Sequence, residues 1–198
     1  MSLLLREYIN LDYSKDQILE FKQKNQPIVL PVLLQKADAK NQNNRIYPKN
    51  ILEREINNYE KAVRERRALG ECDHPDNTVV ELKNASHLIT DIFWDGDDVR
   101  GKIEILNTPC GNILQSLMAS DVKLGVSSRG VGEVRKDEGG RDVVQEDFVL
   151  VCFDVVSEPS TEGAWIGESK IIGSDYIRSA LPKNDRINRI VNEILERK

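Results

Sequence analysis

The stretch GECDHP, residues 70–75, places three chemically versatile side chains side by side. Cys72, Asp73 and His74 are consecutive there, and His74 is one of only two histidines in the 198-residue chain. We interpret the stretch as a loop. Its residue types fit a metal-binding corner, a structural turn, or the general base of a catalytic site whose nucleophile lies elsewhere, since histidine is the usual base near neutral pH.

A second stretch, LGVSSRGVG at residues 124–132, supplies candidate nucleophiles. Its glycines are typical of a strand that bends or approaches another segment closely. Successive side chains of a strand point to opposite faces, so Ser127 and Ser128 cannot both face one site. A serine hydroxyl needs a base to become a nucleophile, and the chain offers His74 and His87.

Three other residues have competing structural and functional interpretations. His87 lies in the apolar stretch HLITDIF, which is typical of a packed histidine. Asp154 lies in VCFDVV, where a carboxylate is costly unless it has a partner. Cys152 looks buried, and Cys72 is too close in sequence to His74 for the usual thiol-protease arrangement. The spacing of Cys72, Asp73, His74 and His87 lacks the paired pattern of zinc sites.

Hydrophobic patterning predicts the strands that would carry these residues. PIVLPVLLQ at residues 27–35 indicates a buried strand, and residues 86–106 indicate a hairpin whose turn contains Gly96. Residues 124–132 are predicted as a glycine-rich strand. VVQEDFVLVCFDVV at residues 143–156 is predicted as a long strand region.

Helices are predicted between the strands. Ser14 and Gln17 have capping-box spacing at the start of a short helix. Pro48 suits the first position of a helix that ends near Arg67, and Thr108 suits the N-cap of another. Each of these two helices is expected to bury one face: Leu52, Ile56, Tyr59 and Val63 in the first, and Ile113, Leu114, Leu117 and Met118 in the second.

This order of elements predicts an α+β fold, a small and mostly antiparallel β-barrel or sheet surrounded by helices. We expect residues 1–180 to form one domain. LPKND resembles a linker, and residues 181–198 are expected to form a detachable helical arm. One face of this helix would carry Ile187, Ile190, Val191 and Ile194.

Composition limits the classes of partner. A net charge of -5 argues against nucleic acid as the main partner. The chain has no apolar run of about 18 residues, so we expect no membrane span, and its first residues lack the pattern of a signal peptide. Three cysteines that are far apart favour a reduced, cytosolic protein.

Taken together and in order, GECDHP, LGVSSRGVG and FDVVSEPS resemble the prohead core protein proteases of tailed phages. NQNNRIYPKNILEREI and WDGDDVRGKIEIL fit the same family, so the resemblance covers roughly residues 40–165. It implies a serine protease that matures the prohead by digesting the internal scaffold. It also implies a fold like that of the herpesvirus assemblin proteases, a β-barrel ringed by helices.

The resemblance implies a role for each candidate residue. His74 corresponds to the family's catalytic histidine and Ser127 to its nucleophile, with Ser128 as the alternative because related capsid proteases have a serine followed by x-Gly. Asp154 matches the third member of the site, and His87 is its rival. The expected donors of the oxyanion hole are Arg129 and Gly130 on the nucleophile strand and Gly163 in the following loop.

The same resemblance implies the setting. The substrates would be the phage scaffold or core proteins, the capsid precursor and the protease itself, inside the assembling prohead in the host cytoplasm. We expect self-association, and no cofactor, metal, nucleic acid or membrane partner. The alternative function is a non-catalytic scaffold or capsid-assembly protein that retains the protease fold.

Overall fold

The computed structural model describes residues 3–11, 13–41, 43–73, 75 and 77–157. Two predicted site residues, His74 and Gly163, lie outside the described residues. The predicted arm at residues 181–198 also lies outside them.

The described strands form three sheets. The first has the order β1-β7-β10, the second β2-β6-β5-β4, and the third, a small one, β3-β9-β8. All pairings are antiparallel except that of β3 with β9. The strands are β1 (Leu3–Asn10), β2 (Ile28–Lys36), β3 (Arg45–Ile46), β4 (Leu69–Glu71), β5 (Ala85–Asp95), β6 (Asp98–Ile105), β7 (Gly125–Gly132), β8 (Val134–Lys136), β9 (Asp142–Val144) and β10 (Val149–Val156).

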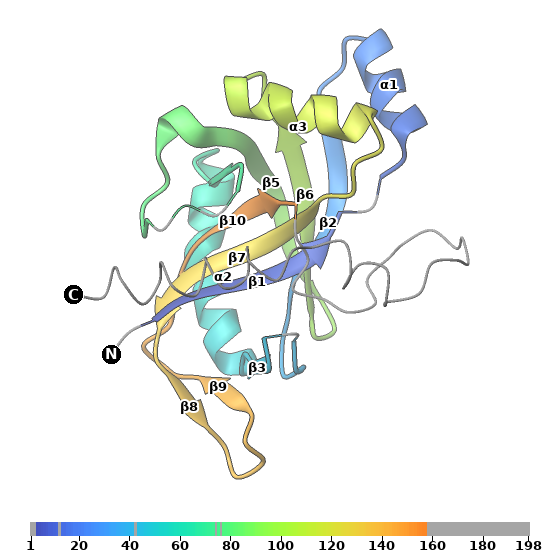
Figure 1. Ribbon diagram of the computed structural model, residues 1–198. Helices are drawn as coiled ribbons and strands as arrows, with labels where there is room; N and C mark the ends of the chain where they lie inside the picture. The colour runs from blue at the N-terminus through green and yellow to red at the C-terminus, as the bar shows by residue number, and fades with distance from the viewer. Residues whose placement is uncertain (1–2, 12, 42, 74, 76, 158–198) are drawn as a thin grey trace, which may run out of the picture. The chain divides into compact units, whose positions relative to one another are not determined.

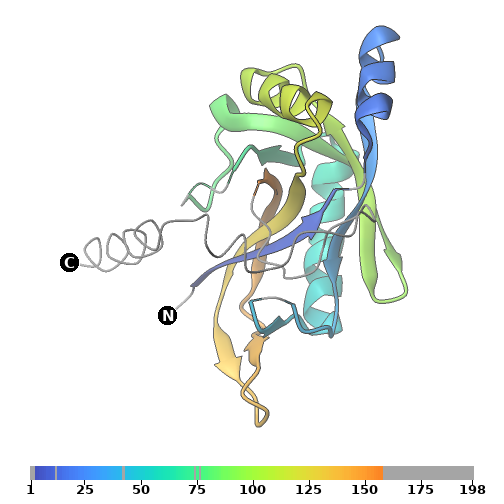
Figure 2. The same cartoon turned by 45° about the vertical axis from the view of Figure 1, so that its right-hand side comes forward.

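Within the described residues, three α-helices pack against these sheets. Helix α2 (Lys49–Arg64) lies along β5 and β10, and α3 (Pro109–Ala119) lies across β5 beside α1 (Lys15–Gln23), as Figures 1 and 2 show. A short 3-10 helix spans Leu82–Asn84. None of the described helices is long and apolar enough to cross a membrane.

The main hydrophobic core joins the first two sheets and the helices. From the first sheet it takes Val126, Phe153 and Val155, and these pack with residues of β2, β5 and β6. Burial of this apolar surface is the main favourable term in folding. The core residues contributed by the second sheet and α2 include Ile28, Leu30, Val32, Leu34, Leu88, Ile89, Ile92, Val99, Ile103, Ile105, Ile56, Tyr59 and Val63.

Most of the predicted elements are confirmed. The α+β class, the antiparallel pairing, the strand β2 and the hairpin β5–β6 are as expected, and the hairpin turns at Gly96 with φ 64°. The described strands form separate sheets, and no closed barrel occurs among them. Side-chain oxygens of Ser14 and Thr108 cap α1 and α3 by accepting from Gln17 N–H and Gly111 N–H. The predicted face of α2 is buried throughout: Leu52, Ile56, Tyr59 and Val63.

Two expectations about the elements were wrong, and one strand was not predicted. The region 143–156 is two strands, because Phe148 N–H donates to the Gln145 carbonyl at 3.1 Å in a turn between β9 and β10. Ile113 of α3 is 52% exposed, since this helix buries a narrower stripe that includes Leu114 and Met118. The first strand, β1, was not predicted at all.

Candidate active site

The predicted nucleophile strand, β7, is the middle strand of the first sheet. Its antiparallel register places Ser127 opposite Asp154 of β10, and Arg129 opposite Cys152. Directly paired residues of antiparallel strands project from the same face. Ser127, Arg129 and Asp154 therefore share one face of this sheet, although they come from strands far apart in the sequence.

The other face of the same strands belongs to the hydrophobic core. Val126 and Phe153 are both in the main core cluster, and Phe153 is the register partner of Ser128. The Ser128 hydroxyl accepts a hydrogen bond of 3.1 Å from the Gln35 amide of β2. Ser128 thus points into the interior between the sheets, whereas Ser127 points away from it.

Asp154 is fully buried, with 0% exposure, and its carboxylate is well partnered. Its Oδ2 lies 2.8 Å from Nε of Arg129, and its Oδ1 accepts from Nη2 of Arg129 and from the Glu71 N–H, each at 3.1 Å. The expectation that this carboxylate has a specific partner is confirmed. The Nη2 contact is a hydrogen bond and the Nε contact an ion pair, so one guanidinium lies close to both carboxylate oxygens.

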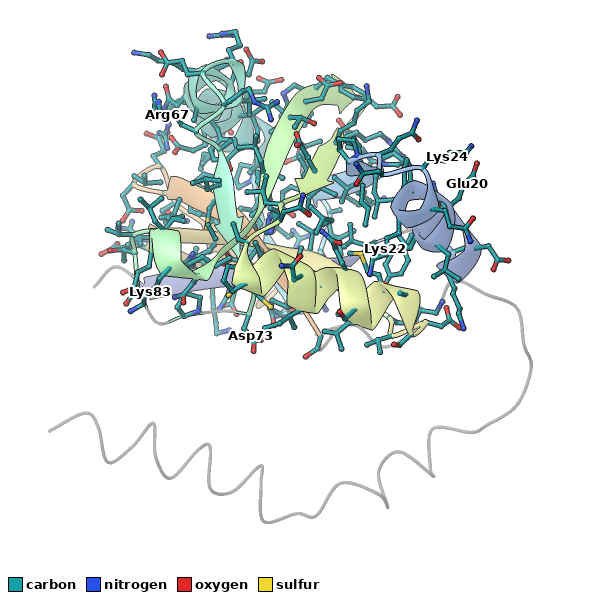
Figure 3. All side chains as sticks on the ribbon, turned by 90° about the horizontal axis from the view of Figure 1, so that it is seen from above. Glu20, Lys22, Lys24, Arg67, Asp73 and Lys83 are labelled. Carbon is teal, nitrogen blue, oxygen red and sulfur yellow. The ribbon has the colours of Figure 1, made fainter. Side chains whose placement is uncertain are left out.

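The segment on either side of His74 is attached to the same strands. Before it, β4 leads to Cys72, which forms a parallel bridge with Val155, and Asp73 N–H donates to the Val155 carbonyl at 2.8 Å. After it, the carbonyl of Asn77 accepts from Nη1 of Arg129 at 2.7 Å. Asp73 has a positive φ of 71°, and its exposed side chain points outward in Figure 3.

Comparisons with known proteins agree on the family of the chain. Residues 18–176 match the model of a family described as prohead core protein serine protease. The prohead core protein protease of Enterobacteria phage T4 is 34% identical over 158 residues, which are 77% of this chain and 74% of the relative. A solved structure of the bacteriophage T4 capsid assembly protease covers 80% of this chain and 99% of its own, with a TM-score of 0.68 and 27% identity.

The chain belongs to the family of prohead core protein serine proteases.

Membership of this family confirms the resemblance found in the sequence motifs. The matched range includes every residue that the sequence predicted for the site, from His74 to Gly163. The likeness to the solved T4 protease agrees with an α+β fold of mostly antiparallel sheets. The chain is therefore a phage protease.

His87, the rival third member, uses both ring nitrogens within the fold. Nε2 lies 2.8 Å from the Phe153 carbonyl, and Nδ1 lies 2.8 Å from the Ser86 hydroxyl. Since a carbonyl only accepts, Nε2 carries the proton and Nδ1 accepts from the hydroxyl. Burial lowers the pKa of His87 to about 4, so the ring is neutral at pH 7. These contacts give His87 a structural role, joining β5 to β10.

Cys72 and Cys152 have the properties of unreactive thiols. Burial, helped by Asp73 and Cys110, raises the pKa of Cys72 to about 11. Burial, and then the Asp154 carboxylate, raises the pKa of Cys152 as well. The thiolate is the nucleophilic form, and at neutral pH both groups are protonated. The protonated state of Cys72 and Cys152 therefore disfavours either of them as the nucleophile of a thiol protease.

Metal ligation has no support in the described part of the chain. Among those residues, no group of three histidine, cysteine, aspartate or glutamate side chains is arranged to hold an ion. Cys72 is half-buried, Asp73 is exposed, and His87 has both nitrogens engaged.

Two of the three predicted oxyanion donors lie within paired strands. Arg129 and Gly130 have register partners in both β1 and β10. In the middle strand of an antiparallel sheet, backbone N–H groups point along the sheet toward neighbouring strands. Their amides are therefore poorly placed to meet a substrate carbonyl.

The sequence interpretation missed Glu71, which is fully buried beside the predicted site. Its carboxylate forms an ion pair with Nη2 of Arg129, and its Oε1 accepts from the Glu81 N–H at 2.8 Å. A signal was present, because Glu71 belongs to the GECDHP motif and Arg129 directly follows the two serines. An acidic residue in the first motif and an arginine inside the apolar stretch LGVSSRGVG are residue types from which an ion pair can be inferred.

Proposed function

We propose that this phage protease is a serine endopeptidase of the Ser-His-Asp type, with Ser127 as nucleophile, His74 as general base and Asp154 as the acidic member. The single observation that carries the assignment is the register of β7 and β10, which pairs Ser127 with Asp154 on the face turned away from the core. Ser128 has the same chemistry but faces Gln35 in the interior. The segment carrying His74 is attached to the Ser127 face.

The proposed reaction is acyl transfer. His74 takes the proton from the Ser127 hydroxyl as its oxygen attacks the scissile carbonyl, and then returns that proton to the leaving amine. Water hydrolyses the acyl-enzyme by the same route. Asp154 accepts a hydrogen bond from the imidazole and stabilises its charged form.

Electrostatics around Asp154 support that role. Arg129 contributes one positive charge, while Glu71 and Asp154 contribute two negative charges when ionised, which leaves one net negative charge in a buried cluster. Opposite charges interact more strongly where water is excluded. A nearby imidazolium is therefore favoured at the moment when His74 holds the serine proton.

An oxyanion hole completes the mechanism. Of the three predicted donors, Arg129 and Gly130 have backbone groups engaged in the sheet, so we assign the role to the amide of Gly163. That assignment rests on sequence position, after β10.

The proposed substrates follow from the family. The T4 relative is named a prohead core protein protease and the solved structure a capsid assembly protease. For this chain we propose cleavage of core or scaffold proteins, of the capsid precursor and of the protease itself, inside the prohead assembling in the host cytoplasm. Self-association and a helical arm at residues 181–198 belong to the same proposal, with no nucleic acid, membrane or cofactor. The non-catalytic alternative is not favoured, because all three proposed catalytic residues are present.

Intact-mass analysis of purified protein during incubation, with phage core protein added as substrate, tests the assignment. Wild type should cleave, and His74→Ala and Ser127→Ala should not. Ser128→Ala should cleave. Loss of cleavage in Ser128→Ala with activity retained in Ser127→Ala would reverse the assignment of the nucleophile. Cleavage that survives both changes would reject the mechanism.

A further inference from the structure

Arg129 makes contacts that its position after the serines does not explain. Its guanidinium binds Glu71, which precedes the Cys-Asp-His run, and the carbonyl of Asn77, which follows it, at 2.7 Å for the second contact. It also binds Asp154 on β10. One side chain of the nucleophile strand thus holds both ends of the segment in which His74 lies.

Glu71 links Arg129 to a later part of the segment that contains His74. Its Oε2 binds Arg129, while its Oε1 accepts from the Glu81 N–H at 2.8 Å. Glu81 in turn accepts a hydrogen bond of 2.9 Å from the Asn77 amide. Residues 71, 77 and 81 are therefore joined to one another and to Arg129, so the loop between them is closed by charge-assisted bonds.

Burying these three charged side chains carries a large desolvation penalty, so the cluster is a poor means of stabilising the fold alone. Arg129, Glu71 and Asp154 are all at 0% exposure. Removing charges from water costs several kcal/mol per ion, and apolar side chains of similar size are often as stabilising or more so. What directional ion pairs supply, and apolar contacts do not, is a fixed geometry between the segments that they join.

We propose that Arg129 is a positioning residue of the active site, which clamps the loop carrying His74 in register with the strand carrying Ser127. The inference rests on the proposed function, because it assumes that these two residues react. Arg129 touches no reacting atom. It acts by limiting the freedom of the general base, and small displacements of catalytic groups are costly to the rate.

The test compares one substitution at two arginines. Arg129→Lys keeps the charge but loses the planar fork that reaches two carboxylates and a carbonyl. Arg54→Lys is the matched control, because Arg54 also binds a carboxylate, Glu55, and two carbonyls, at 2.7–2.9 Å, far from Ser127 in the sequence. Cleavage of phage core protein would be measured over a range of substrate concentrations, together with hydrogen exchange of residues 77–81.

In Arg129→Lys we expect kcat to fall on the order of 100-fold while KM changes little, because binding is intact and the base is misplaced. Exchange at residues 77–81 should become faster. Arg54→Lys should leave kcat and this exchange unchanged. A lower thermal stability of Arg129→Lys with an unchanged kcat would overturn the proposal, since that is what a purely structural ion pair predicts.

A second variant covers the case in which Arg129→Lys does not fold. Glu71→Gln keeps the shape and an acceptor but removes one charge, and we expect kcat to fall about tenfold with faster exchange at residues 77–81. Unchanged kcat and exchange in a folded Glu71→Gln would reject the clamp. If wild type does not cleave, or Ser127→Ala cleaves normally, the proposed function fails and the catalytic role of Arg129 fails with it. Faster exchange in the variants would still establish the clamp.

Discussion

The two faces of β7 carry adjacent residues of the same type with different surroundings. Ser127 and Ser128 are 1% and 2% exposed, so burial does not distinguish them. On one face, Ser127 has Arg129 and Asp154 beside it. On the other, Ser128 has Gln35, Phe153 and the apolar core.

The difference shows that the surroundings of each serine depend on the residue opposite it in β10 more than on the Ser-Ser motif itself. Alternation along β7 separates the two serines, and the register with β10 then gives Asp154 to one and Phe153 to the other. A slip of one residue would pair Ser128 with Asp154 and Ser127 with Val155 instead. We therefore expect substitutions on the Ser127 face to lower activity, and substitutions on the Ser128 face to lower stability.

The largest expected effect is at the serines themselves. Ser127→Ala should lower kcat by more than about 1,000-fold, as loss of a nucleophile does. Ser128→Ala removes one buried hydrogen bond and should cost about 1 kcal/mol of unfolding free energy with kcat nearly unchanged. Initial cleavage rates and urea unfolding of both variants check this. Similar losses of activity in both variants would contradict the proposed difference between the two faces of β7.

The next pair lies on β10. Asp154→Asn should lower kcat about 1,000-fold or more, because an amide does not stabilise an imidazolium as a carboxylate does. Phe153→Leu, its neighbour on the core face, removes an edge-to-face contact with Tyr59 at 5.4 Å and should cost about 1–2 kcal/mol of stability. Steady-state kinetics should show near-normal kcat for Phe153→Leu. A large loss there would mean that the core face also takes part in catalysis.

The pH dependence of stability tests whether His87 is only structural. Its pKa is about 4 in the folded protein and about 6.5 when unfolded. Between these values the unfolded chain binds a proton that the folded chain does not, so stability falls as the pH is lowered from 6.5 to 4, by about 3 kcal/mol.

Urea unfolding at a series of pH values would measure this effect. His87→Gln should be less stable at pH 7, because it loses the fitted contacts to Ser86 and Phe153. Its stability should decline less steeply between pH 6.5 and 4. An identical slope in wild type and variant would show that His87 does not titrate as its burial implies.

An effect on stability, with no role in the chemistry, is expected at a glycine of the core face. A Cβ on Gly130 would lie 2.4 Å from Cε2 of Phe148 and 2.8 Å from the Val149 carbonyl. Gly130→Ala should therefore cost about 1–3 kcal/mol by overpacking. Gly139→Ala, in an exposed turn where the nearest atom is 3.3 Å away, is the control and should be nearly neutral in thermal unfolding. Equal melting temperatures for the two variants would contradict the packing described.

Local patterns were sufficient for the helices and the central hairpin. The α2 face, the Thr108 cap and the Gly96 turn all depend on residues close in sequence. Strand β1 was missed because LLLREYIN has no clear alternation, and its partner β7 lies far along the chain. Strand propensity reflects such distant neighbours more than the strand itself.

The candidate site also combines features that local sequence predicts with contacts between distant segments that it does not. Alternation predicted that only one serine can face a given site, but not which one, because the answer depends on the register with β10. The buried position of Asp154 was a local signal, whereas its pairing with Arg129 and Glu71 joins three separate strands. Contacts of this kind depend on the order and register of the strands, which cannot be read from any single stretch of sequence.

The place of β7 between β1 and β10 also affects when the enzyme can become active. Of the described strands, β1 is synthesised first and β10 last. The sheet that pairs Ser127 with Asp154 closes only after residue 156 has left the ribosome, and such distant pairings form slowly. A nascent chain shorter than this therefore cannot pair Ser127 with Asp154, and the proposed mechanism then predicts no proteolysis before β10 has been made.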